Sequence, residues 1–79
     1  MKKAHLHAVR MSYIDQQIRA NRYPNCTQLA KKFEVNTKTI FRDIDYMRDH
    51  FGAPIEFDKK RNGYYYAKPD FYLPMIHLN

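Results

Sequence analysis

The sequence predicts a small α+β domain in which three helices are followed by a β-hairpin. Three observations support this fold class. Apolar residues recur every three or four positions, the period of an α-helix, in three stretches before residue 52. Asn25 and Asn36, which suit helix N-caps, precede the second and third stretches. After Gly52 the pattern changes to two short strand-like runs separated by a turn with an Asn-Gly pair. We assign residues 4–68 to this domain and residues 69–79 to an apolar linker or tail.

The first helix is expected from about Lys3 to Ala20, and it carries two apolar stripes. The stripe that should face the other helices consists of His7, Met11, Ile14 and Ile18. The second stripe lies on nearly the opposite face and consists of Leu6, Val9 and Tyr13. This second stripe needs a cover of its own, which is either the hairpin, the C-terminal tail or another subunit. Pro24 follows the helix and predicts an extended backbone at Tyr23.

A short second helix and a tight turn come next. Asn25 should cap this helix, and Gln28, three positions later, completes a capping-box pair. The inward face of the helix consists of Cys26, Leu29, Ala30 and Phe33. Val35 should fill the turn to the third helix, and Glu34 stands where many such turns have glycine, because a positive φ is common there. A short helix, a turn holding a small apolar residue and a second helix form a helix-turn-helix.

The third helix is expected over residues 37–50, with Asn36 as its cap. Its inner face consists of Ile40, Ile44, Met47 and Phe51. Asp43 falls on the inner flank and should pair with a cation of the first helix, such as Arg10. The outer face gathers polar, basic and aromatic side chains in the first two turns: Thr37, Lys38, Thr39, Phe41 and Arg42. A helix that enters the DNA major groove by its N-terminal end needs side chains of these kinds there.

Roles for the outer residues follow from their chemistry. Arg42 is expected to make a bidentate contact with guanine, and Lys38 is expected to contact a base or a phosphate. Phe41 either meets a thymine methyl group or packs as a partly buried ring against Val35 or the wing. Tyr46 lies further from the helix start, which favours a phosphate contact over a base contact.

The residues after Gly52 predict a hairpin that completes a winged helix-turn-helix. Ile55–Asp58 alternates apolar and acidic residues, as does a strand with one buried face, and Tyr64–Ala67 forms the returning strand. The turn between them carries three consecutive cations: Lys59, Lys60 and Arg61. In a wing over residues 58–63 these side chains would lie on the phosphate backbone or in the minor groove. The alternative is a basic loop tip that is merely solvated.

The composition favours a polyanionic partner. The chain has 79 residues and a formal net charge of +6, with a pI of about 9.6. The charge is uneven, because residues 1–24 contribute +4 (five basic, one acidic) whereas residues 37–51 contribute 0 (three basic, three acidic). Phosphate attraction would therefore come mainly from the amino end, the first helix and the hairpin.

Other classes of function find little support. The only cysteine, Cys26, rules out an internal disulfide framework and is expected to be a small buried side chain. No apolar run approaches the ~20 residues of a membrane span, and no signal peptide follows the basic start, so a cytoplasmic, nucleoid-associated protein is expected. His5 and His7 lack a third metal ligand at useful spacing, and no nucleophile-base pair is visible. We therefore expect no enzyme and no cofactor.

Several runs together resemble a known family. They are Arg22–Asn25, Leu29–Ala30, Phe33–Val35, Thr39–Ile44, Gly52–Glu56 and Gly63–Tyr66. The resemblance is to the N-terminal winged-helix domain of bacterial WYL-domain transcriptional regulators, which is similar to the DeoR-type DNA-binding fold. It implies a linker, for which Phe71–Pro74 looks like the beginning, and a ligand-sensing C-terminal domain that is absent from this chain. The chain would then be either a truncation or a short form of such a regulator.

Two hypotheses of function remain open. The first is a sequence-specific binder of double-stranded DNA in a transcriptional regulator, acting as a homodimer on paired half-sites. The second is a winged helix used for protein interaction or dimerisation without DNA reading. Lys38 and Arg42 on one exposed face favour the first hypothesis, and the neutral third helix with the second stripe of the first helix favours the other. The apolar tail around Phe71 should dock on the domain's own surface, on another subunit or on a following domain.

Overall fold

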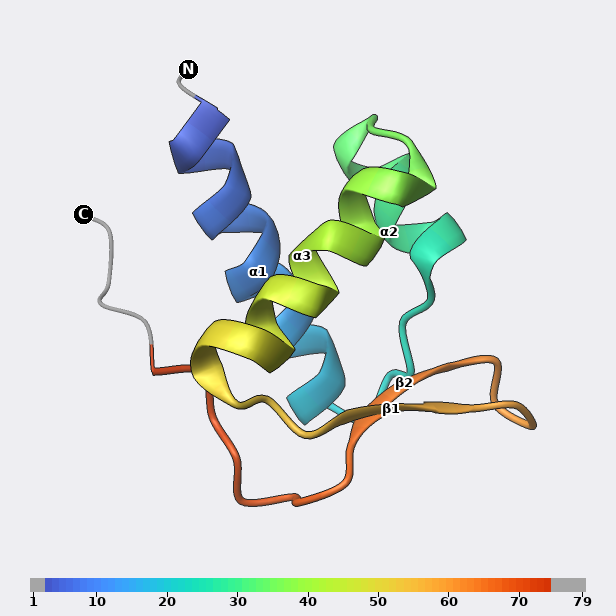
Figure 1. The fold of residues 1–79 in the computed structure, drawn as a ribbon. Helices are drawn as coiled ribbons and strands as arrows, with labels where there is room; N and C mark the ends of the chain where they lie inside the picture. The colour runs from blue at the N-terminus through green and yellow to red at the C-terminus, as the bar shows by residue number, and fades with distance from the viewer. Residues whose placement is uncertain (1–2, 75–79) are drawn as a thin grey trace.

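Three helices and a two-stranded antiparallel hairpin form the fold, as the sequence predicts. A computed structural model of the chain describes the backbone of residues 3–74 and the side chains of residues 6–74. The elements are α1 (Lys3–Arg19), α2 (Cys26–Phe33), α3 (Thr37–Phe51), β1 (Ile55–Asp58) and β2 (Gly63–Tyr66). α1 and α3 cross, α2 lies beside the N-terminal half of α3, and the hairpin projects past the helices (Figure 1). This arrangement is that of a winged helix.

The predicted helix caps are confirmed, although α1 ends one residue before the expected Ala20 and α3 ends one residue after the expected His50. Asn25 caps α2 by accepting from the amide of Gln28 at 2.8 Å, and the Gln28 side chain accepts from the amide of Asn25 at 3.2 Å. Asn36 caps α3, and Gly52 ends α3 in the left-handed region with φ 66°. Glu34 also adopts a positive φ, 56°, so the turn does impose the conformation that usually favours glycine. That conformation costs a residue with a Cβ about 1 kcal/mol.

The core forms where the inner faces of the helices meet. Its fully buried side chains are Ile14, Leu29, Ile40, Ile44 and Met47. The second stripe of α1 fares differently. Tyr13 is covered by the Phe33 ring, with centroids 5.4 Å apart, but Leu6 and Val9 remain 39% and 42% exposed. The hairpin and the described part of the tail therefore leave Leu6 and Val9 uncovered, contrary to the expectation that one of them covers this stripe.

The hairpin is shifted relative to the prediction. β1 occupies the expected residues, but β2 begins at Gly63 instead of Tyr64, because Asp58 pairs with Gly63 in the ladder. The alternating pattern of β1 predicted one buried face, and Ile55 is buried as expected. Phe57 is 44% exposed, because the outer part of the hairpin projects beyond the helices that bury Ile55.

Gly63 has a different role from the one that the Asn-Gly pair suggested. Asn62 takes the positive φ, 54°, whereas a Cβ on Gly63 would lie 1.8 Å from the Tyr23 carbonyl oxygen. Tyr23 itself has a φ of 50°, so the extended backbone predicted from Pro24 is wrong. Contacts with the hairpin accompany this conformation, since the Tyr23 ring lies beside the Tyr65 ring with centroids 6.1 Å apart. Close packing between this loop and β2 thus outweighs the local preference.

The tail folds back on the domain as far as the structure describes it. The Phe71 ring packs edge-on against Tyr66, with centroids 4.9 Å apart, and Leu73 is buried. Tyr72 between them is 67% exposed. Of the three expected docking places, residues up to 74 use the domain's own surface, and residues 75–79 lie outside the described part.

Substitution of Gly63 by alanine tests the close approach between β2 and the α1–α2 loop. We expect Gly63→Ala to lower the free energy of unfolding by about 1–3 kcal/mol, because the new methyl group forces the Tyr23 backbone to move. Gly52→Ala is the matched control, since a Cβ there meets no atom within 4 Å and brings only the strain of a positive φ, about 1 kcal/mol. Urea denaturation measures both, and a larger loss for Gly52→Ala would contradict the proposed crowding.

Candidate nucleic-acid interface

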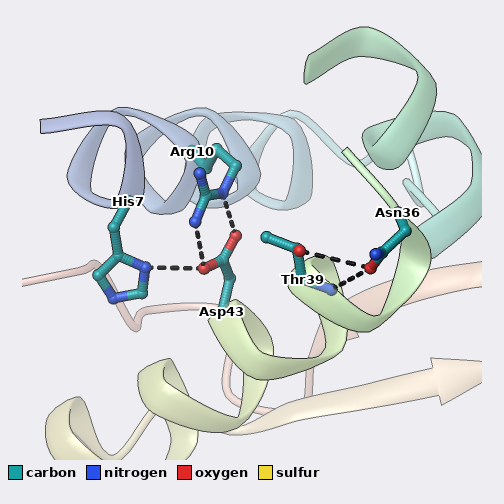
Figure 2. Close-up of polar contacts among 5 residues, drawn as sticks. All are labelled: His7, Arg10, Asn36, Thr39 and Asp43. Atoms are coloured by element: carbon teal, nitrogen blue, oxygen red, sulfur yellow. Dashed lines mark hydrogen bonds and ion pairs between the residues drawn. The ribbon is translucent and has the colours of Figure 1, made fainter. Parts of the chain in front are cut away.

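A buried carboxylate fixes how α3 lies against α1. Asp43 is 1% exposed and receives two bonds from Arg10, Nε to Oδ2 at 2.5 Å and Nη2 to Oδ1 at 3.1 Å (Figure 2). His7 Nδ1 lies 2.7 Å from Oδ1, a distance at which its N–H donates. The predicted pairing of Asp43 with a cation of the first helix is confirmed. A buried carboxylate without such partners would be strongly destabilising, so these contacts tie the rotation of α3 to α1.

With Asp43 turned inward, the predicted contact residues of α3 face solvent, with one exception. Lys38 and Arg42 are exposed, as is Thr37, and Phe41 is 51% exposed. Thr39 is half-buried, and its amide and hydroxyl both donate to Asn36 Oδ1 at 3.1 and 3.4 Å (Figure 2). The hydroxyl of Thr39 is therefore already used in the helix cap.

The charges of α3 cancel in the sequence but separate in space. Lys38 and Arg42 are exposed in the N-terminal half, whereas Asp45 and Asp49 are exposed in the C-terminal half. Arg48 offsets them only in part, because its Nη1 atom lies 3.4 Å from Asp45 Oδ1 while its guanidinium also donates to the Ile55 carbonyl at 3.2 and 3.0 Å. A polyanion would therefore be attracted to the N-terminal half of α3 and repelled from the rest.

Tyr46 belongs to an aromatic cluster on the side of α3 that faces α1. Its ring stacks on His50, with centroids 3.9 Å apart, and meets the His7 ring edge-on at 4.9 Å. Phe51 adds a further edge contact at 5.8 Å. Tyr46 is still 38% exposed, so one side of the ring is accessible while its position is held by three neighbours.

At the tip of the wing, two cations are exposed and one is held. Lys59 and Lys60 are exposed, and no ion pair involves either of them within the described residues. Arg61 Nη1 lies 3.2 Å from Asp58 Oδ2, and its guanidinium carbon lies 4.8 Å from the centre of the Tyr23 ring. The backbone amide of Arg61, which donates to Asp58, is the main cause that lowers the pKa of this carboxyl group. Sequence reasoning treated the three cations alike.

The base of the wing is bonded to the loop that precedes α2. The Tyr64 amide donates to the Pro24 carbonyl at 2.8 Å, and the Asn25 side chain donates to the Asn62 carbonyl at 3.1 Å. The Tyr64 hydroxyl and Cys26 Sγ are 3.4 Å apart. Cys26 is buried, as predicted, and burial raises the pKa of its thiol. These contacts set the direction of the wing relative to α2, and thereby relative to α3.

Between the wing, α3 and the start of α2 lies an open hollow of about 410 Å³. Its lining residues come from four elements (α2, α3, β1 and β2) and two connecting segments: Asn25, Cys26, Thr27, Gln28, Phe41, Phe57, Asn62 and Tyr64. Of these, Phe41 alone was a predicted site residue. Thr27, Gln28 and Phe57 were missed, because no sequence spacing shows that the hairpin brings residue 57 opposite residues 27 and 41.

Comparison with known families decides the class of the chain. A family model described as an HTH domain matches residues 10–65, more than half of the chain. The chain belongs to the HTH domain family. The matched residues begin within α1 and end within β2, so this HTH domain includes both the helix-turn-helix and most of the wing. Searches among curated proteins and among solved structures found no match.

Neither a membrane-spanning helix nor a cluster of metal ligands is found among the residues that the structure describes. Over residues 3–74, no helix has the length and apolar character needed to cross a membrane. In the same described part of the chain, no three His, Cys, Asp or Glu side chains gather as metal ligands would.

Removal of Asp43 tests its role in holding α3. We expect Asp43→Ala to lower the free energy of unfolding by about 3–5 kcal/mol, because it leaves Arg10, which is only 11% exposed, without its partner. Asp45→Ala is the matched control on the same helix, since its ion pair with Arg48 is exposed and such pairs contribute roughly 0–1 kcal/mol. Urea denaturation measures both variants. Equal losses would show that the buried pair does not govern this packing.

Proposed function

We propose that this HTH domain binds double-stranded DNA in a sequence-specific manner as part of a bacterial transcriptional regulator. The observation that supports this most is the exposure of Lys38 and Arg42 on the N-terminal half of α3, the helix that follows the tight turn. In helix-turn-helix proteins the second helix of the motif lies in the major groove and contacts bases with its N-terminal residues. The exposed acidic residues further along α3 suit an approach by the N-terminal end alone.

Each exposed side chain of α3 has a proposed role. Arg42 makes a bidentate contact with guanine, and Lys38 contacts a neighbouring base or phosphate. Thr37 donates at the helix start, and Phe41 meets the edge of the groove, where a thymine methyl group can contact it. Thr39 acts indirectly, through the cap that positions the first turn. Tyr46 meets a phosphate on the side of α3 that faces α1.

The wing and the resemblance to WYL-domain regulators complete the proposal. Lys59 and Lys60 lie against the phosphate backbone or the minor groove, whereas Arg61 contributes less, because Asp58 and Tyr23 already hold it. The resemblance favours a homodimer at the nucleoid that binds paired half-sites and is regulated by a ligand-sensing domain.

A second candidate function is a protein-interaction or dimerisation module without DNA reading. The exposure of Leu6 and Val9 on α1 favours it, because a helix surface with two adjacent apolar side chains suits a subunit contact. This surface and the exposed face of α3 are separate, so a subunit contact through α1 is compatible with DNA binding.

Arg42 variants separate these two functions. We expect the domain to bind a duplex selected from a randomised pool more tightly than an unrelated duplex, as measured by fluorescence anisotropy. Arg42→Ala should lose about 1–3 kcal/mol of this discrimination, roughly 5- to 150-fold. Arg42→Lys is the matched control, because it keeps the charge and the weak background binding but loses the bidentate geometry. If the wild-type domain binds neither duplex at low salt, the interaction module is favoured instead.

Removal of the wing lysines should change the salt dependence of DNA binding without changing its sequence specificity. Replacing both Lys59 and Lys60 by alanine should reduce the slope of log K against log salt by about two, because each phosphate contact contributes ~0.9. Lys68→Ala, which removes an exposed cation beyond the wing, should leave the slope unchanged. Wing variants with the wild-type slope would show that the tip is only solvated.

A further inference from the structure

Of the residues that line the open hollow beside α3, Phe41 alone takes part in a contact proposed so far. The hollow adjoins the proposed DNA-binding surface at two places. One is α3, where Phe41 precedes Arg42, and the other is the wing turn, where Asn62 follows the segment that carries Lys59 and Lys60. An object that touches both α3 and the tip of the wing must pass over this hollow. The chemistry of the residues that line the hollow therefore indicates which part of the DNA the hollow faces.

Two exposed aromatic rings give the hollow an apolar wall. Phe41 is 51% exposed and Phe57 is 44% exposed, so both rings offer free surface while they line the same space. The Phe57 ring is held edge-on against Tyr64, with centroids 5.2 Å apart and an interplanar angle of 73°. Tyr64 is in turn fixed by Cys26 at 3.4 Å. The apolar wall is thus positioned before any ligand arrives.

The rest of the lining is mostly polar and carries no negative charge. Thr27 and Gln28, in the first turn of α2, are exposed and line the hollow together with Asn25 and Asn62. None of the described residues that line it is acidic. Hydroxyl, amide and helix-start N–H groups are the usual partners of DNA phosphates. Apolar rings and such groups around one open hollow match the DNA backbone, which alternates apolar sugar faces with anionic phosphates.

We propose that this hollow receives the sugar-phosphate backbone of one strand of the bound duplex. Phe57 lies against deoxyribose, Phe41 lies beside it at the edge of the groove, and the first turn of α2 faces the adjacent phosphate. This inference rests on the proposed DNA binding and adds a subsite to it. The Phe57 ring contributes affinity that depends neither on base sequence nor on salt, because an apolar contact with a sugar releases no counterion.

A tryptophan probe tests whether DNA enters the hollow. The chain contains no tryptophan, so Phe57→Trp introduces a unique fluorophore at the apolar wall. We expect a bound duplex to quench or shift its emission at the same concentrations at which anisotropy reports binding. Tyr72→Trp is the matched control, because Tyr72 is 67% exposed in the tail, and its emission should not change. Anisotropy binding without any change at position 57 overturns the subsite but leaves the DNA-binding function standing.

Two further outcomes are decisive in the same experiment. If anisotropy detects no binding of wild-type protein to any duplex, the proposed function fails and the subsite fails with it. Thymidine monophosphate alone serves as the competing ligand. If it changes the emission of the Phe57→Trp variant as strongly as the duplex does, the hollow holds a free nucleotide and the proposal is overturned.

Truncation of the ring measures its contribution to binding. Phe57→Ala should weaken binding to the selected duplex and to an unrelated duplex alike, by about tenfold, the order expected when tens of Å² of apolar surface lose their cover. The salt slope should stay at its wild-type value, and Phe57→Leu should recover most of the affinity. Tyr72→Ala is the control for removing an exposed ring, and thermal denaturation checks that each variant is folded. Unchanged affinity in Phe57→Ala, or a loss confined to the selected duplex, contradicts the sugar contact.

Discussion

The interaction on which the arrangement of this domain depends is the buried contact of Asp43 with Arg10 and His7. Apolar packing alone would hold α1 and α3 together, but it is non-directional and specifies rotation only loosely. A carboxylate with 1% exposure must keep its hydrogen-bond partners, so it permits one rotation of α3. That rotation turns Lys38 and Arg42 to solvent and leaves the charges of the helix divided between its two halves. The buried pair thereby determines which end of α3 a polyanion can approach.

A second constraint orients the wing. The α1–α2 loop contacts the hairpin through backbone atoms, since the Tyr23 carbonyl fills the space that a side chain at Gly63 would need. Tyr23 accepts a left-handed backbone in this position, and its ring lies under the Arg61 guanidinium. Such a conformation is strained for a bulky residue and persists where surrounding contacts fix it. The wing thus has a defined direction relative to α3, and the hollow between them is a built feature of the fold.

How far the sequence anticipated this structure depended on how local each feature is. The caps at Asn25 and Asn36 and the helix end at Gly52 were predicted, because each arises from residues within one turn. The Asp43 contact was also predicted, since helical periodicity placed it on the inner flank. The backbone of Tyr23 and the exposure of Phe57 were predicted wrongly. The backbone of Tyr23 is set by contacts with the hairpin, and the exposure of Phe57 is set by the direction in which the hairpin projects. No local sequence pattern predicts that direction.

The candidate site divides in the same way. The sequence by itself determined the three helices, the hairpin and the basic and aromatic residues gathered at the start of α3, because periodicity and capping act over a few residues. Only the tertiary structure decided that Arg61 is held while Lys59 and Lys60 are exposed. It alone brought Phe57 beside Phe41 to form the hollow. These features require segments tens of residues apart to meet, and that meeting is set by the packing of the whole core.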